Sequence, residues 1–309
     1  MRSKSSLPGY RWPLALAGVL TAQVLAACSG TQQEEVTPDD PDELPGPSRG
    51  SAVVLSADDE VAVAVNRDVG SVSVFALSYN REGYSSDYKQ AYLPTVTKTA
   101  EIALGEGSEP WQAVISPTGR AAYVILRKDQ QVVRISDLRG HPYEDGRAQV
   151  GSEPTGIAMT PSGKWLWVAN WVDGTLSEVE AASMTVKSTV DLNKVLVGYG
   201  HLGDVAPRPS LAHPRSVAIT SNLDKRDDDE SVLITEYYGQ RVEPLAPDGS
   251  NADSSLVGLV YKLSLQDRKV EVIKLGPLED MGFKDQDGGK AGCFPNQLSR
   301  SPWRASTPT

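Results

Sequence analysis

The chain of 309 residues is poor in the residues that most often carry chemistry: two cysteines, three histidines and only 6% aromatic residues. No two histidines stand at a metal-ligand spacing such as His-x-x-x-His, so the sequence indicates no zinc site. It contains no Cys-x-x-Cys-His motif and no phosphate-binding loop. Covalent haem within this chain is therefore excluded, and no paired nucleophile and base is visible. We expect no metal site, no cofactor and no catalytic residues.

Positive charge is also scarce, because 30 lysines and arginines face 40 acidic residues and give a net charge of -10. Three of the basic residues (Arg2, Lys4 and Arg11) lie in an N-terminal leader. The remainder therefore has 27 basic residues (30 − 3) against 40 acidic ones, a net charge of -13. Such a surface repels phosphate backbones, so we expect no nucleic-acid partner.

The leader has the parts of an export signal, with a basic start followed by an apolar run over residues 12–27. This run is shorter than the about 20 residues that span a bilayer comfortably. It ends in Leu25-Ala26-Ala27-Cys28, which resembles the lipobox of bacterial lipoproteins. The alternative is an ordinary signal peptide with an incidental cysteine.

The lipobox resemblance implies that residues 1–27 are a signal peptide and that the Cys28 thiol carries the lipid. We therefore expect the protein to be anchored by this N-terminal lipid to a membrane of the bacterial cell envelope. Ser29, rather than an aspartate, follows Cys28. By the family's sorting habit this indicates the outer membrane, with the protein facing the periplasm or the cell surface. Residues 28–50 are acidic, rich in proline and almost free of apolar residues, so we expect a disordered tether there.

Residues 153–191 form a unit of about forty residues that sets the pattern for the rest of the chain. Three short apolar runs are separated by Pro161-Ser162-Gly163 and by Asp173-Gly174, and a fourth β-rich run covers residues 184–190. Proline and glycine favour tight reversals, because proline fixes φ and glycine adopts positive φ. The unit therefore predicts four antiparallel strands.

The unit recurs along the chain. Pro110 and Pro154 are 44 positions apart (154 − 110), Pro214 follows 60 positions later (214 − 154), and Tyr123 stands where Trp167 does. An earlier, degenerate copy covers residues 56–75. We expect Val63, Tyr123 and Trp167 to occupy equivalent buried positions.

These repeats resemble the YVTN family of β-propellers, most clearly in Trp167-Val168-Ala169-Asn170 and in Thr175-Leu176-Ser177-Glu178-Val179-Glu180. The resemblance covers about residues 51–275 and implies an all-β fold of four-stranded antiparallel blades. We expect about four blades within residues 51–292. Residues 193–212, rich in glycine and proline, are expected to form a long loop after the third blade.

Residues 293–309 read as the start of a fifth blade at Cys293 followed by an irregular tail. Because relatives commonly have about seven blades, we expect an incomplete propeller whose open edges allow self-association. A closed ring of four blades and a dimer of two half-rings are the alternatives.

Five residues flank the prolines that open the first strands, namely Glu109, Trp111, Glu153, His213 and Arg215. We expect them to gather where these strands begin, since a tryptophan and an arginine beside carboxylates suit recognition of a polar partner. The alternative is that they only cap strands.

The sequence favours a binding module whose partner is an unknown protein or small molecule. The alternative is the propeller part of an exported enzyme, either lactonase-like or a haem- or quinone-dependent oxidoreductase, whose catalytic elements lie outside this chain. That alternative would need acid and base groups at the channel mouth, for which Glu109, Glu153, His213 and Glu236 are loose candidates.

Overall fold

The structure, a computed structural model, describes residues 46–79, 94–199, 205–241, 243–251 and 255–276, together with Leu278, Gly289, Pro295, Gln297 and Leu298. The predicted signal peptide, Cys28 and Cys293 lie outside these residues. Within them, no helix has the length and apolar character needed to cross a membrane.

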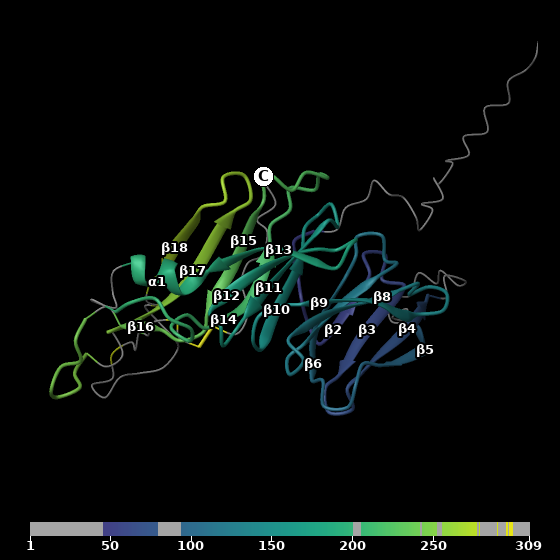
Figure 1. Cartoon of the computed structure of the whole chain (residues 1–309), viewed down its shortest axis with the longest axis horizontal. Helices are drawn as coiled ribbons and strands as arrows, with labels where there is room; N and C mark the ends of the chain where they lie inside the picture. Colours follow the sequence, from purple (N-terminus) through teal and green to yellow (C-terminus); the bar gives the residue numbers. More distant parts are fainter. Residues whose placement is uncertain are drawn as a thin grey trace, which may run out of the picture. The chain divides into compact units, whose positions relative to one another are not determined.

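About half of the described chain is antiparallel β-sheet, made mainly from consecutive strands (Figure 1). The first sheet contains β2 (Val53–Leu55), β3 (Val61–Asn66), β4 (Ser71–Ser78) and β5 (Thr95–Ala103). The second contains β6 (Pro110–Ile115), β7 (Ala122–Leu126), β8 (Gln131–Ser136) and β9 (Tyr143–Gln149). The third contains β10 (Pro154–Met159), β11 (Trp165–Asn170), β12 (Thr175–Glu180) and β13 (Thr185–Asp191).

The fourth sheet repeats this meander and adds two short strands. Its members are β14 (Pro214–Ile219), β15 (Ser231–Glu236), β17 (Leu256–Ser264) and β18 (Val270–Leu275), with β1 (Ser48–Arg49) paired to β14 and β16 (Gln240–Arg241) paired to β17. The predicted four four-stranded units are thus confirmed.

Each sheet packs against the next through a shared apolar core. In chain order, the three cores contain Val63 and Val124, then Ile125 and Leu166, then Trp167 and Ile234. Neighbouring residues of one strand, such as Val124 and Ile125, serve two different cores because successive side chains point to opposite faces of a sheet. Face-to-face packing of successive four-stranded meanders is the arrangement of β-propeller blades.

The repeat also fixes the register inside each blade. Val63, Tyr123 and Trp167 are all buried, at 0%, 5% and 0% exposure. Each lies opposite the equivalent residue of its first strand, with Val63 facing Val54, Tyr123 facing Val114 and Trp167 facing Ala158. The predicted equivalence of these three positions is confirmed.

Strand pairing begins at Ser48, inside the segment expected to be a tether up to residue 50. Ser48 and Arg49 pair with β14, the Gly50 amide donates to the Ile157 carbonyl of β10 at 2.6 Å, and Ser51 bridges Ala113 of β6. Polar composition did not reveal this, because the strand pairing uses backbone groups; the Ser48 hydroxyl also accepts from the Met159 amide at 3.1 Å. A Cβ on Gly50 would lie 2.7 Å from Ile157, so this approach requires glycine.

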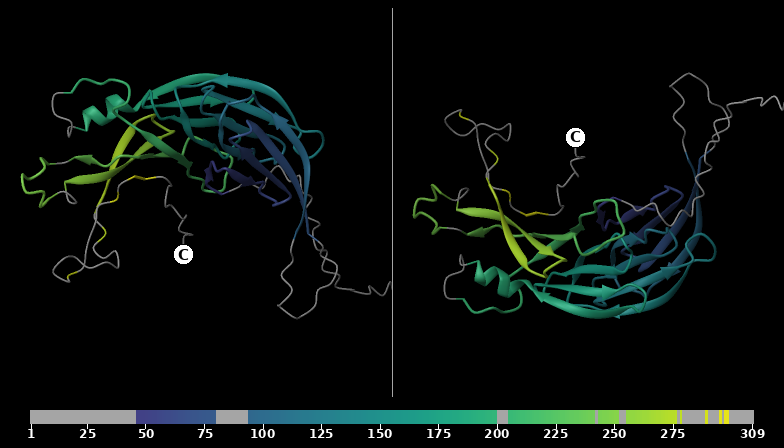
Figure 2. Two further views of the ribbon diagram at one scale, coloured as in Figure 1. Left: turned by 90° about the horizontal axis from the view of Figure 1, so that it is seen from below. Right: turned by 90° about the horizontal axis from the view of Figure 1, so that it is seen from above.

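The segment expected as a loop over residues 193–212 begins instead with helix α1 (Leu192–Gly198). The Asp191 side chain caps it by accepting from the Asn193 and Lys194 amides. Leu192 and Leu196 are buried in the third core, and α1 contacts β12 and β18 (Figure 2). The glycines and prolines after Gly198 obscured this short apolar helix in the sequence.

Candidate functional site

The second, third and fourth blades begin in the same way at their opening prolines. The carbonyl before each proline accepts a 3.0 Å hydrogen bond from the residue that follows the second strand of the same blade. The three acceptor and donor pairs are Glu109 and Arg127, Glu153 and Trp171, and His213 and Tyr237. In the first blade, the residue directly after the second strand is Arg67. The repeat therefore brings these four residues to equivalent positions at the end of the second strands.

Trp111, the second residue of β6, is surrounded by arginines from three blades. The Cζ atoms of Arg127, Arg67 and Arg215 lie 4.6, 4.9 and 5.2 Å from the centre of its ring. Cations over a tryptophan face are attracted by about 0.5–2 kcal/mol each. We call Trp111, the three arginines and the neighbouring Trp171 and Tyr237 the arginine–tryptophan site.

Two of the three arginines are balanced by the glutamates that precede the prolines. Glu109 lies 3.7 Å from Arg67, and Glu153 forms a close ion pair with Arg127. Both glutamates have a left-handed backbone, with φ of 53° and 48°. Such a backbone is strained in a non-glycine residue, and Glu109 and Glu153 both adopt it beside the arginine–tryptophan site.

Arg215 is different, because no carboxylate among the described residues pairs with it. Its Cζ atom lies 5.5 Å from the Trp171 ring centre and 5.9 Å from that of Tyr237, in addition to Trp111. Burial, and then the positive charge of Arg127, lower the pKa of the Arg215 guanidinium. Arg127 also keeps its buried Nε atom without a hydrogen-bond partner in the described part of the chain.

Beyond Arg215 lies a cluster of aromatic rings. Trp171 packs edge-on against His213 and Tyr237, with centroids 5.2 and 5.0 Å apart. Tyr238 contacts His213 and Tyr237, each at 4.9 Å. Burial lowers the pKa of the His213 imidazole, so its ring is neutral at pH 7.

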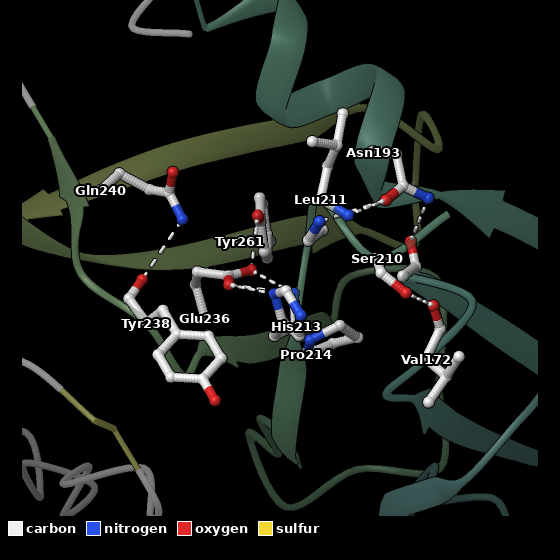
Figure 3. A network of polar contacts seen from close by, with 12 residues as sticks. Val172, Asn193, Ser210, Leu211, His213, Pro214, Glu236, Tyr238, Gln240 and Tyr261 are labelled. Carbon is white, nitrogen blue, oxygen red and sulfur yellow. Dashed lines mark hydrogen bonds and ion pairs between the residues drawn. The ribbon is translucent and has the colours of Figure 1, made fainter. Parts of the chain in front are cut away.

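Glu236, the last residue of β15, is fully buried and lies beside His213 and Tyr261 (Figure 3). Both carboxyl oxygens accept from the His213 backbone amide at 2.9 Å, and the Tyr261 hydroxyl donates to one of them at 2.8 Å. Burial raises the pKa of Glu236 to about 7, although these hydrogen bonds act in the opposite direction.

A cavity of about 540 Å³ adjoins the arginine–tryptophan site. Residues 46–55 line one part of it, and β6 and β14 line the rest, including Trp111 and Arg215. This volume lies in the range of about 300–1,000 Å³ that small-molecule sites occupy. Among the residues that the structure describes, no three His, Cys, Asp or Glu side chains are grouped as metal ligands would be.

The structure brings together Trp111 and Arg215, which the sequence had singled out. Glu109 and Glu153 lie at the rim as ion-pair partners, and His213 contacts the site through Trp171. Sequence reasoning missed the four residues that follow the second strands, Arg67, Arg127, Trp171 and Tyr237. Their shared position directly after each second strand is the signal that could have found them.

No family model and no curated protein matches the sequence. Solved structures similar to it include a candidate 6-phosphogluconolactonase from Bacteroides uniformis, with 17% identity, a TM-score of 0.44, and coverage of 73% of this chain and 53% of that one. Kuenenia stuttgartiensis hydrazine synthase has 16% identity and a TM-score of 0.41, with 82% and 71% covered. The Pseudomonas aeruginosa periplasmic gluconolactonase PpgL has 23% identity and a TM-score of 0.36, with 46% and 40% covered.

The chain thus spans about half or less of the length of these two lactonase-type structures. At such identities and TM-scores, the function has to be argued from the site itself.

Proposed function

We propose that the protein is a binding module that recognises a small anionic ligand at the arginine–tryptophan site. The observation that carries this is Arg215, a half-buried guanidinium with no carboxylate partner among the described residues. A charge removed from water is costly unless it is paired. A ligand oxyanion would supply the missing partner.

The chemistry of the site defines the ligand class. Guanidinium groups bind carboxylates and phosphates through two parallel hydrogen bonds. The rings of Trp111, Trp171 and Tyr237 around Arg215 favour a ligand with a flat or apolar body next to its anionic group. We expect an organic acid or an organic phosphate.

The lipid anchor belongs to the same proposal. The lipobox-like Leu25-Ala26-Ala27-Cys28 supports acylation of Cys28 and retention in the cell envelope. The acidic segment after it would hold the blades away from the membrane surface. A binding module placed in this way samples ligands in the envelope.

The lactonase-like alternative is weaker on physical grounds. Catalysis would need an acid or base group that reaches a substrate. Glu236 is fully buried and both its oxygens already accept hydrogen bonds, while Glu109 and Glu153 are paired with arginines. These contacts favour binding over catalysis.

The test is equilibrium binding of benzoate and of sulfate to the purified protein, measured by calorimetry. Arg215→Gln removes the unpaired charge and should weaken benzoate binding at least about tenfold, since hydrogen bonds to charged groups contribute about 1.5–3 kcal/mol. Trp111→Ala should weaken benzoate more than sulfate, because only benzoate has a ring.

Arg226→Gln is the matched control, because Arg226 is exposed and pairs with Asp228 outside the site. It should bind benzoate as the wild type does. If Trp111→Ala combined with Arg215→Ala folds and still binds both anions normally, the proposed site is wrong.

A further inference from the structure

Blade four departs from the first and third blades at the last residue of the second strand, a position that Leu126 holds in blade two. In the first and third blades the second strand ends in Asn66 and Asn170, whose amides each donate hydrogen bonds of 2.9 and 3.0 Å to two hydroxyls of the third strand. Glu236 holds this position in blade four, since it pairs with Pro214 as Asn170 pairs with Pro154.

The residue whose hydroxyl contacts this position in the third strand also differs in blade four. Tyr261 lies opposite Ile234 as Ser177 lies opposite Val168, so the tyrosine replaces the serine that Asn170 contacts. The result in blade four is a hydrogen bond from the Tyr261 hydroxyl to the Glu236 carboxyl. An amide cannot change its protonation state near neutral pH, whereas a carboxyl can. This substitution therefore adds a titratable group to a buried network.

Glu236 has contacts that reach the arginine–tryptophan site from two directions. Its carboxyl accepts from the backbone of His213, whose ring packs against Trp171. The next residue along the chain is Tyr237, whose ring lies 5.9 Å from the Arg215 guanidinium. The carboxyl therefore holds the backbone at His213 and lies next to Tyr237 in the chain, and the rings near both residues line the site.

The charge of Glu236 is as isolated as that of Arg215. No lysine or arginine among the described residues pairs with it, and the His213 Nδ1 atom is 3.9 Å from the nearer carboxyl oxygen. An ionised Glu236 places an uncompensated negative charge beneath a site that attracts anions. A bound anion disfavours that ionised form, because like charges repel in a medium of low dielectric constant.

We propose, on the basis of the function proposed above, that Glu236 is a proton-linked positioning residue: anion binding at Arg215 is accompanied by uptake of a proton from solvent by the Glu236 carboxyl. The proton forms one O–H bond on the carboxyl, and no other covalent bond changes. By linkage, the affinity for the anion rises as the pH falls through the range in which Glu236 titrates.

The groups that face Glu236 leave it as the one that titrates near neutral pH. Burial lowers the pKa of His213 from 6.5, so this ring gains its proton only below that value. Burial raises the pKa of Tyr261 well above 10.0, so its hydroxyl stays protonated. Tyr238 contributes a backbone hydrogen bond to the carboxyl, and Arg215 remains charged. Burial raises the pKa of Glu236 itself to about 7.

The experiment measures the dissociation constant of benzoate between about pH 6.5 and about pH 8.5, a range in which benzoate stays ionised and which lies above the lowered pKa of His213. The wild type should bind at least about fivefold more tightly at the lower pH, the size of a typical coupling between two sites. Glu236→Gln keeps the shape of the side chain and removes the proton, so its affinity should not change with pH. Calorimetry in two buffers of different ionisation enthalpy should show proton uptake by the wild type and none by this variant.

Two further variants test whether Glu236 or His213 is the group that makes anion binding depend on pH. Tyr261→Phe removes a hydrogen bond that stabilises the ionised carboxyl, so the midpoint of the pH profile should move upward. His213→Gln leaves the titrating carboxyl in place, so the affinity should still rise as the pH falls. If Glu236→Gln does not fold, an unchanged midpoint in Tyr261→Phe overturns the inference and an upward shift supports it.

The outcomes also distinguish this inference from the function on which it rests. Failure of benzoate and sulfate to bind at every pH removes the proposed function and the inference together. Binding that is lost in Arg215→Gln but does not vary with pH overturns the inference alone. Binding whose pH profile is flattened by His213→Gln rather than by Glu236→Gln overturns it as well.

Discussion

Trp167 and Trp171 stand four positions apart and have opposite roles. Trp167 lies inside β11 and is fully buried, with the Arg268 guanidinium 4.8 Å from its ring centre. Trp171 follows the strand, where the chain turns, and its ring contacts His213 and Arg215. The residue type is the same, so the place relative to the strand end decides whether the side chain builds the core or the site.

Replacement of Glu236 by glutamine is expected to remove a pH dependence of stability. The carboxyl has a pKa of about 7 in the folded chain, against an ordinary 4.5. Between these values the folded state keeps a proton that the unfolded state has lost. The free energy of unfolding therefore falls as the pH rises through this window, by about 3 kcal/mol at full effect.

Urea denaturation of wild type and Glu236→Gln at several pH values measures this. The difference between the two proteins is the informative quantity, because other groups titrate equally in both. Carboxyls whose pKa is lowered in the folded chain, such as Asp58 and Asp145, lose their contribution only as the pH falls below the window. Parallel stability curves for the two proteins would contradict the expected titration of Glu236.

At this scale the sequence predicted part of the site. Trp111 and Arg215 were found because each follows an opening proline, a position visible in the repeat. Arg67 and Trp171 could not be found by residue type, because the repeat places a different kind of side chain at that position in different blades. What these residues share is their place directly after each second strand, which is visible once the strand ends are known.

At the scale of elements, α1 depends on one side chain for its attachment. The Asn193 Nδ2 group donates to the Asp173 carbonyl at 2.8 Å and the Gly174 carbonyl at 3.2 Å. Its Oδ1 atom accepts from the backbone amides of Leu211 and Ala212 at 3.2 and 3.1 Å. One buried amide therefore holds a turn of the third blade and both ends of the insertion together.

Asn193→Ala is expected to loosen this insertion locally while leaving the blades folded. Loss of several buried hydrogen bonds should cost about 1–3 kcal/mol and expose unpaired backbone groups. Hydrogen exchange should become faster at the Leu211 and Ala212 amides, which lose their acceptor. Lys194→Ala is the matched control, because that side chain is 72% exposed. Equal exchange rates in the two variants would show that Asn193 does not hold the insertion.

Elements with strong local signals were predicted, and elements that depend on distant partners were not. Turn residues and short apolar runs gave the strands of the four blades, because each such strand pairs with its neighbour in sequence. β1 has two residues and pairs with β14 far along the chain, so no local pattern marks it. The capping residue Asp191 was the available signal for α1.

At the scale of the whole molecule, the net charge bears on how the proposed site would meet an anion. The chain has a net charge of -10, and yet three arginines surround Trp111. The arginines of this site would attract an anion that the net charge of the chain repels, which favours selective over general anion binding.

Attachment to the membrane is expected to depend on Cys28. A protein acylated there should incorporate an alkynyl fatty acid and sediment with membranes, since each buried CH₂ contributes about 0.8 kcal/mol to anchoring. Cys28→Ser should remain unlabelled. Equal labelling of the two proteins would mean that the lipid is absent or carried elsewhere.

The pairing of β1 with β14 has a consequence for the order of assembly. Ser48 meets Ile219, a separation of 171 positions (219 − 48), so a chain that emerges from its N-terminus must complete three blades before this contact can form. Until then the inner edges of β6, β10 and β14 keep backbone groups without these partners. Contacts of such long sequence separation slow folding. Residues 48–51 are thus made before the first blade but reach all their partners only after the third blade is complete, which leaves those edges open to other chains for longer.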